Sequence, residues 1–153
     1  MVAEEILKTE KTYVEVLSNL KNVFQKKMSV ENTAFTQQEV KEIFPSALSS
    51  ILMIQEVFKE ELEKIISNWN NYSFIGKLFE RQIPYIKFYI SYVSCYESSL
   101  KSLRTAKNRD PESVKQFLKS IFIEIGDHRN FDLVKKKNFL HFLISFFFFE
   151  FYL

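Results

Sequence analysis

The chain opens with the stretch Glu4-Glu5-Ile6-Leu7-Lys8-Thr9-Glu10-Lys11-Thr12-Tyr13-Val14-Glu15-Val16-Leu17, whose pattern predicts a long helix with two faces suited to burial. The core face is an apolar stripe at helical spacing, formed by Ile6, Tyr13, Leu17, Leu20 and Phe24. The solvent face is polar and carries Lys8, Lys11, Glu15, Ser18 and Asn19. Between them lies a narrow strip, Glu5, Thr9, Thr12 and Val16, hereafter the contact strip. One carboxylate among small uncharged side chains is more typical of a contact surface than of a solvated face.

Length and composition favour one all-helical domain. With 153 residues the chain is long enough to bury a substantial core, and its 46% apolar and 26% charged residues are typical of a globular protein. Two glycines and three prolines are too few for the tight turns of a sheet-rich fold. The net charge of +2 gives no reason to expect nucleic acid as a partner. One cysteine, Cys95, fits a reducing compartment, and Met1 leads directly into charged helix, so we expect a cytoplasmic protein.

Helix start and stop signals and the spacing of apolar residues along the rest of the chain predict a helical bundle. We expect helical segments at about 3–28, 36–44, 46–67, 74–82, 84–106 and 110–124. Thr36 and Glu39 match a capping box, and Asp110-Pro111 places an N-cap before a proline at the first helical position. The helix at 46–67 has apolar residues at helical spacing, namely Leu48, Leu52, Val57, Phe58, Leu62 and Ile65. The aromatic tract near 84–106 has the same spacing, in Tyr85, Phe88, Tyr89, Tyr92 and Tyr96, which is more typical of a core face than of a ligand site.

The sequence contains no residue pattern that indicates an enzyme's active site. Gly76 and Gly126 are isolated, so no phosphate-binding loop is present in the sequence. His128 and His141 lie thirteen positions apart and far from Cys95, which is not the spacing of a metal site. We therefore predict no metal and no cofactor.

Five sequence motifs follow one another along the chain. They are Glu5 to Val14, Ile43-Phe44-Pro45, the tract Tyr85 to Glu97, Val114 to Leu118, and Arg129-Asn130-Phe131-Asp132-Leu133. Together they resemble the Dbl-homology domain, the helical module of guanine-nucleotide exchange factors for Rho-family GTPases. The resemblance covers residues 3–134 and implies an elongated all-α bundle.

The resemblance also implies a function for the contact strip. In this family, the acidic residue that corresponds to Glu5 contacts the first switch loop of the GTPase, and Thr9 and Thr12 become neighbours on the contacting face. The implied protein is a regulator that promotes GDP release from a Rho/Rac-type GTPase, not a bond-making enzyme. From helix spacing alone, Glu5 has a plainer interpretation, because a carboxylate near a helix N-terminus stabilises the helix dipole.

The pattern stops after Leu133. In the family, the step that matches Asp132-Leu133 leads into a third conserved region with a Pro-Val-Gln-Arg-like core, which supplies the second-switch contacts, and a pleckstrin-homology domain usually follows. Here no Gln-Arg pair occurs after residue 133. We therefore expect a truncated Dbl-homology domain at residues 1–134, incomplete at its C-terminus, and exchange that is weak or absent in this chain alone.

Residues 135–153 are expected to form a Phe-rich tail outside the family pattern. Seven of the fifteen residues at 139–153 are phenylalanine. This segment is too short for a membrane span, which needs about 20 residues. With Lys135 to Lys137 in front, weak interfacial anchoring through 139–153 is the only membrane association that we expect. Four consecutive phenylalanines fit neither helical nor strand amphipathicity, so we interpret the tail as out-of-frame or unspliced coding.

Two alternatives remain open at this point. The chain could be a helical protein-interaction module without exchange activity, or a helical protein anchored by its tail. Failure to bind nucleotide-free Rho and Rac proteins favours the first, and carbonate-resistant membrane fractionation favours the second.

Overall fold

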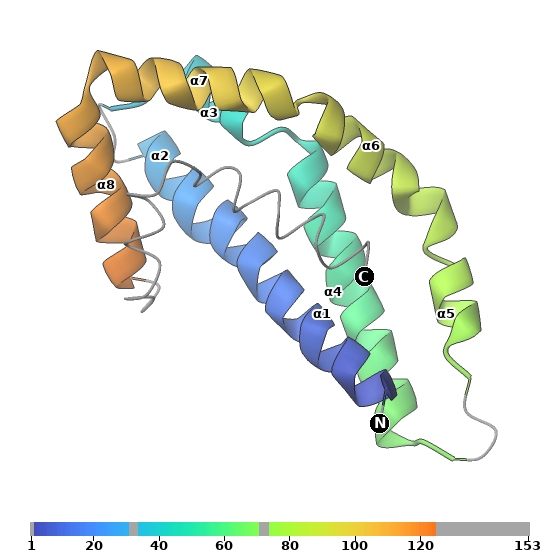
Figure 1. Cartoon of the computed structure of the whole chain (residues 1–153). Coiled ribbons are helices and arrows are strands. Elements are labelled where there is room, and N and C mark those ends of the chain that lie inside the picture. Colours follow the sequence, from blue (N-terminus) through green and yellow to red (C-terminus); the bar gives the residue numbers. More distant parts are fainter. Residues whose placement is uncertain (1, 31–33, 71–73, 125–153) are drawn as a thin grey trace.

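A computed structural model describes residues 2–30, 34–70 and 74–124 (Figure 1). Every element in these three ranges is helical, which confirms the predicted all-α class. In chain order they are α1 (Val2–Asn19), η1 (Leu20–Gln25), α2 (Lys26–Val30), α3 (Gln37–Ile43), α4 (Ala47–Ser67), α5 (Gly76–Glu80), η2 (Ile83–Tyr85), α6 (Ile86–Ser94), α7 (Tyr96–Arg109) and α8 (Pro111–Glu124). Residues 125–153 lie outside the described residues, and with them the motif Arg129-Asn130-Phe131-Asp132-Leu133, the predicted tail, His128 and His141.

The predicted first helix is one helical run that contains a π-helical turn, η1, between α1 and α2. A π turn is wider than an α turn, so side chains four residues apart keep pointing to the same side. Leu20, Phe24 and Met28 have this spacing, and all three are buried. The π turn therefore keeps the apolar stripe on the core as the helix continues past Asn19.

The main core lies where α1 packs along α4, with α4 running back in the opposite direction (Figure 1). Leu17 and Ile51 are completely buried there. A smaller cluster near the other end joins Phe58 and Leu62 of α4 to Leu78 of α5. Burying a side chain of this size stabilises the fold by roughly 1.5–3 kcal/mol, so these contacts set the position of α1.

Complementary apolar stripes predict that the first helix packs against the aromatic helix 84–106. In the structure the principal partner of α1 is α4, and α6 lies on α4 instead. The two predicted partners meet at Tyr13 and Tyr89, whose hydroxyl groups interact. An apolar stripe shows that a helix face is covered but does not identify which helix covers it.

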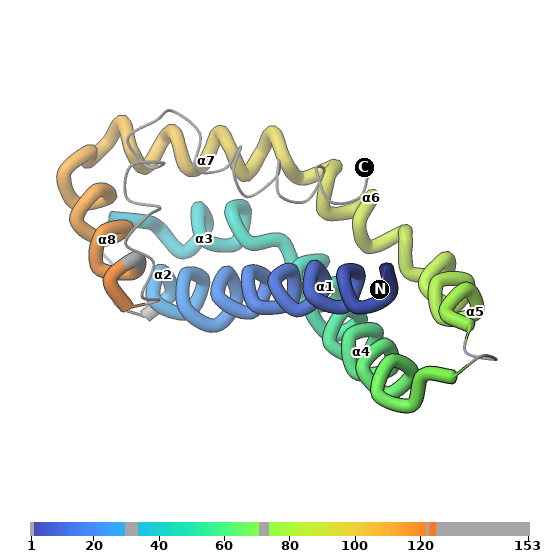
Figure 2. Tube along the Cα trace, turned by 60° about the horizontal axis from the view of Figure 1, so that its bottom comes forward, coloured from blue at the N-terminus to red at the C-terminus, as the bar shows by residue number. Residues whose placement is uncertain are grey.

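Two further details differ from the sequence-based expectation. The predicted helix 84–106 is broken at Cys95 into α6 and α7, which form a bent rod along one side of the molecule (Figure 2). Val57 and Tyr85, both predicted in core faces, are 53% and 41% exposed. Phe88, Tyr89, Tyr92 and Tyr96 pack against the core, as predicted.

Polar contacts fasten α3 to α7. The predicted capping box is present, with the Glu39 backbone N–H donating to Thr36 Oγ1 at 3.2 Å and the Thr36 N–H donating to Glu39 Oε2 at 2.7 Å. Arg109, at the end of α7, donates to both carboxylate oxygens of Glu39, at 2.7 and 2.8 Å, and to the Ala34 carbonyl at 2.7 Å. These bonds, chiefly those from Arg109, lower the pKa of Glu39 to about 2.

The final described helix begins as predicted. The Ser113 backbone N–H donates to Asp110 Oδ1 at 3.0 Å, which makes Asp110 the N-cap, and Pro111 is the first helical residue. Phe117 of α8 packs edge-on against Phe35, with ring centroids 5.7 Å apart. This contact places α8 beside the segment that leads into α3.

Candidate functional site

The three predicted contact residues, Glu5, Thr9 and Thr12, all lie on α1. Their spacing of four and three residues puts them on one flank of the helix, together with Val16. Glu5 and Thr12 are exposed, whereas Thr9 and Val16 are half-buried. The Thr12 hydroxyl donates to the carbonyl of Lys8 at 3.2 Å, so the helix itself holds this side chain. The contact strip is therefore a surface flank of α1 with its apolar edge turned towards the core.

Glu5 lies in the first turn of α1, next to Glu4. Both carboxylates are exposed, and both are favoured there by the positive end of the helix dipole. Position alone therefore does not separate a helix-stabilising Glu5 from a partner-binding one. The two residues point about 100° apart around the helix, which gives a way to separate these roles by mutation.

A third acidic residue of α1, Glu10, was not predicted from the sequence. It is 9% exposed and faces the same side as Tyr13 and Leu17. Burial, together with Tyr89 and Glu10, raises the pKa of Tyr13 above its ordinary value of 10, and burial with Glu10 does the same for Tyr89. Its place in the helical repeat, between Ile6 and Leu17 on the core side, was a signal that could have identified it. Glu10 and Tyr13 of α1 therefore interact with Tyr89 of α6.

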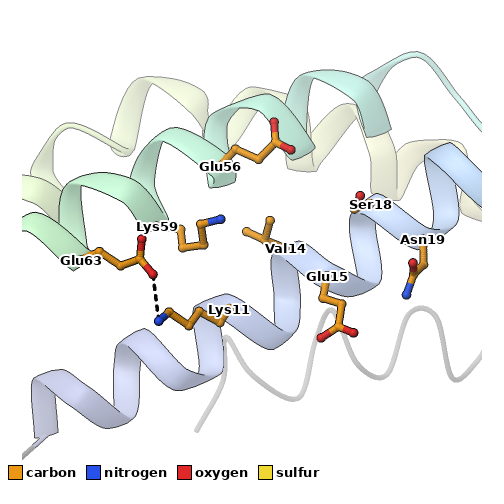
Figure 3. A pocket seen from close by; sticks show the side chains of 8 residues that line it. All are labelled: Lys11, Val14, Glu15, Ser18, Asn19, Glu56, Lys59 and Glu63. Atoms are coloured by element: carbon orange, nitrogen blue, oxygen red, sulfur yellow. Dashed lines mark ion pairs between the residues drawn. The ribbon is translucent and has the colours of Figure 1, made fainter. Parts of the chain in front are cut away.

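On its other flank, α1 forms an open groove with α4 (Figure 3). Eight residues line it: Lys11, Val14, Glu15, Ser18 and Asn19 from α1, and Glu56, Lys59 and Glu63 from α4. Lys11 Nζ and Glu63 Oε1 form an ion pair at 2.8 Å across the groove. Helix spacing predicts a plain solvent face for four of these α1 residues, because spacing does not show where α4 lies.

Within the described ranges, no group of three His, Cys, Asp or Glu side chains is arranged to hold a metal ion. No helix in the same ranges is long and apolar enough to cross a membrane.

Comparison with known proteins identifies the family. The sequence profile of the RhoGEF domain matches residues 2–145, nearly the whole chain. The chain belongs to the RhoGEF domain family. This is the Dbl-homology family that the motifs resemble. The match ends eleven residues beyond the boundary predicted at 134, and that boundary remains a prediction.

The curated relatives are much longer proteins. The chain is 30% identical, over 114 residues, to FYVE, RhoGEF and PH domain-containing protein 1 of mouse, with 72% of the chain and 12% of that protein aligned. It is 32% identical over 114 residues to mouse FYVE, RhoGEF and PH domain-containing protein 4, which aligns over 15% of its length. Mouse Protein ECT2 is 28% identical over 115 residues, which are 72% of the chain and 12% of that relative. No solved structure matches the chain.

Proposed function

We propose that this RhoGEF domain binds a Rho/Rac-type GTPase and promotes the release of its GDP. The GTPase family follows from the RhoGEF match, and the remaining steps are inferences from the surface of α1. A domain of this kind acts by binding the nucleotide-free GTPase more tightly than the nucleotide-bound form. The difference between the two affinities lowers the affinity for GDP, because the coupling between two ligands is reciprocal.

Glu5 is the residue that we assign to the first switch of the GTPase. Its carboxylate is exposed at the N-terminal end of α1 and can accept hydrogen bonds from backbone or hydroxyl donors of a partner. A charge-assisted hydrogen bond of this type contributes roughly 1.5–3 kcal/mol. Thr9 and Thr12 continue the same flank with short side chains that let a partner backbone approach closely.

The observation that carries the proposal is the coincidence of the family motif with an exposed flank of a well-anchored helix. The helix α1 is fixed by α4 on one side and by Tyr89 on another, so its contact strip is presented on a rigid element. Rigid presentation lowers the entropy lost on binding.

We further propose that exchange is weak in residues 1–153 alone. The second-switch contacts of the family come from a region with a Gln-Arg pair, and residues 134–153 contain neither glutamine nor arginine. Binding without fast exchange is then the expected behaviour, because only one of the two switches is held.

A paired measurement tests this proposal. Binding to Rho- and Rac-type GTPases is measured with nucleotide removed by a chelator and with GDP bound, and GDP release is followed with a fluorescent analogue. We expect the nucleotide-free form to bind more tightly, with slow release. Equal affinity for the two forms would contradict the proposed exchange function, and no binding to either form would favour a helical interaction module without a GTPase partner.

A further inference from the structure

The helix α6 is apolar on two sides, and the structure covers one of them. Its inner side is aromatic and packs against the core, where α4 is its principal partner. Its outer side lies at the edge of the molecule (Figure 1 and Figure 2). A row of branched aliphatic side chains, hereafter the α6 seam, is 47–62% exposed and comprises Ile83 of η2 with Ile86, Ile90 and Val93 of α6. A helix that is apolar on more than one side is typically buried on each of them, so the exposed seam is unusual.

The spacing of the α6 seam is that of a helix that packs against another helix. Its residues follow one another at intervals of three, four and three, which is the 3.5-residue repeat of coiled-coil seams. Because η2 is a 3₁₀ turn, in which side chains three residues apart eclipse each other, Ile83 stays in line with Ile86. The spacing therefore indicates a helix as the partner of this side.

The α6 seam is also almost free of charge. In residues 83–94 the sole charged side chain is Lys87. The next helix, α7, differs, because its outer side exposes Lys101 and Arg104 and is an ordinary solvated face. A nearly uncharged side offers no ionic recognition to a charged partner, and two copies of it can meet without strong like-charge repulsion. These properties fit a second copy of the same helix.

We propose that the chain forms a dimer in which the α6 seams of two copies pack against each other. A two-fold contact uses the same patch on both copies. Ile90 lies in the central part of the seam, so the two copies of Ile90 lie within about one helical turn of each other, whichever direction the helices run. This inference does not depend on the proposed GTPase contact, which lies on α1.

The size of the seam determines how strong this dimer is. Residues 83–94 form a segment roughly 20 Å long, and a helix with its side chains is about 10–12 Å across. Its outer side supplies only part of the roughly 800 Å² that each partner contributes to a standard interface. We therefore expect a weak, reversible dimer with a dissociation constant in the micromolar range.

Sedimentation of the full chain at concentrations from about 1 to 200 µM tests the dimer. The mean mass of the parent should rise with concentration from that of one copy towards that of two. Ile90→Glu and Ile90→Lys should each stay monomeric, because like charges then meet across the interface, whereas an equal mixture of the two should dimerise again. Met53→Glu is the matched control, since Met53 is 62% exposed, as Ile90 is, but lies on α4, and this variant should dimerise like the parent.

Each other outcome overturns the proposal. A parent that stays monomeric over the whole range has no such dimer. If Ile90→Glu associates like the parent, the copies meet elsewhere, as they would through the Phe-rich tail. If Met53→Glu weakens the dimer as much as Ile90→Glu does, the contact is not specific to the seam, and if the mixture stays monomeric, the seam does not meet its own copy. Circular dichroism should show parent-like helix content in all variants, because both positions are exposed.

Discussion

Replacing Glu39 by glutamine should remove most of the acid sensitivity that α3 and α7 contribute to the fold. The Glu39 side chain is 10% exposed and takes two hydrogen bonds from Arg109 and one from the Thr36 N–H. Glutamine keeps an acceptor for the Thr36 N–H, as capping boxes allow, but cannot carry the charge that Arg109 binds. The change therefore isolates the ionic part of this contact.

The expected magnitude follows from the pKa of Glu39, which is lowered from 4.5 to about 2. At roughly 1.4 kcal/mol for each pH unit, this difference sets an upper limit of about 3 kcal/mol. Because the Arg109 side chain is 43% exposed, solvent screens the pair, and we expect a contribution of about 1–2 kcal/mol. A lowered pKa stabilises the folded state above pH 4.5, and that stability is lost as the pH falls from 4.5 towards 2.

The assay is denaturant unfolding of parent and Glu39→Gln at pH 7, 4.5, 3 and 2.5, followed by helical circular dichroism. The variant should be less stable by about 1–2 kcal/mol at pH 7, and the difference should shrink steadily below pH 4.5, to less than half of its pH 7 value at pH 2.5. Glu112→Gln is the control, since Glu112 pairs with Lys115 in an exposed contact of 3.3 Å that should contribute little. A constant difference between parent and Glu39→Gln at every pH would show that the charge of Glu39 does not stabilise the fold.

Two further predictions concern the core and the tail. Leu17→Ala should lower the free energy of unfolding by about 2–5 kcal/mol because Leu17 is completely buried, whereas Val57→Ala, at an exposed position, should change it by less than about 0.5 kcal/mol in the same denaturant titration. Deleting residues 135–153 should raise solubility and leave GTPase binding unchanged, because the tail has apolar residues without a usable period. A melting temperature that falls by many degrees on deletion would show that this segment supports the fold.

Local signals in the sequence were sufficient for the helix starts. Thr36 with Glu39, and Asp110 with Pro111, act within one turn of backbone, so their effect does not depend on the rest of the fold. The buried residues of α4 were also largely predictable, since a repeat of three and four residues determines which side is apolar.

Features set by distant partners could not be read in the same way. Arg109 and Glu39 are 70 positions apart, and nothing in either local sequence indicates that the other is near. No proline or glycine lies at the break at Cys95, so the local sequence does not indicate it. The π turn at Leu20–Gln25 likewise contains no proline or glycine. Val57 was assigned to the core by its spacing, but no described helix covers that part of α4.

The candidate site likewise combines features that the local sequence determines with features that depend on a distant helix. The flank that contains Glu5, Thr9 and Thr12 could be defined from helix geometry alone, because all three residues lie on one element. The groove could not, because three of its eight lining residues come from α4, and the pairing of Lys11 with Glu63 appears only when the two helices are placed together.

The most direct test of the proposed GTPase contact compares Glu5→Ala with Glu4→Ala. Both residues are exposed in the first turn of α1, so each substitution removes similar helix-dipole stabilisation, but only Glu5 belongs to the contact strip. The dissociation constant for a nucleotide-free Rac- or Rho-type GTPase is measured for both variants and the parent. We predict that Glu5→Ala weakens binding by about 10- to 150-fold, the loss of one charge-assisted hydrogen bond, while Glu4→Ala binds like the parent. Equal affinities for all three proteins would contradict the assignment of Glu5 to the GTPase contact.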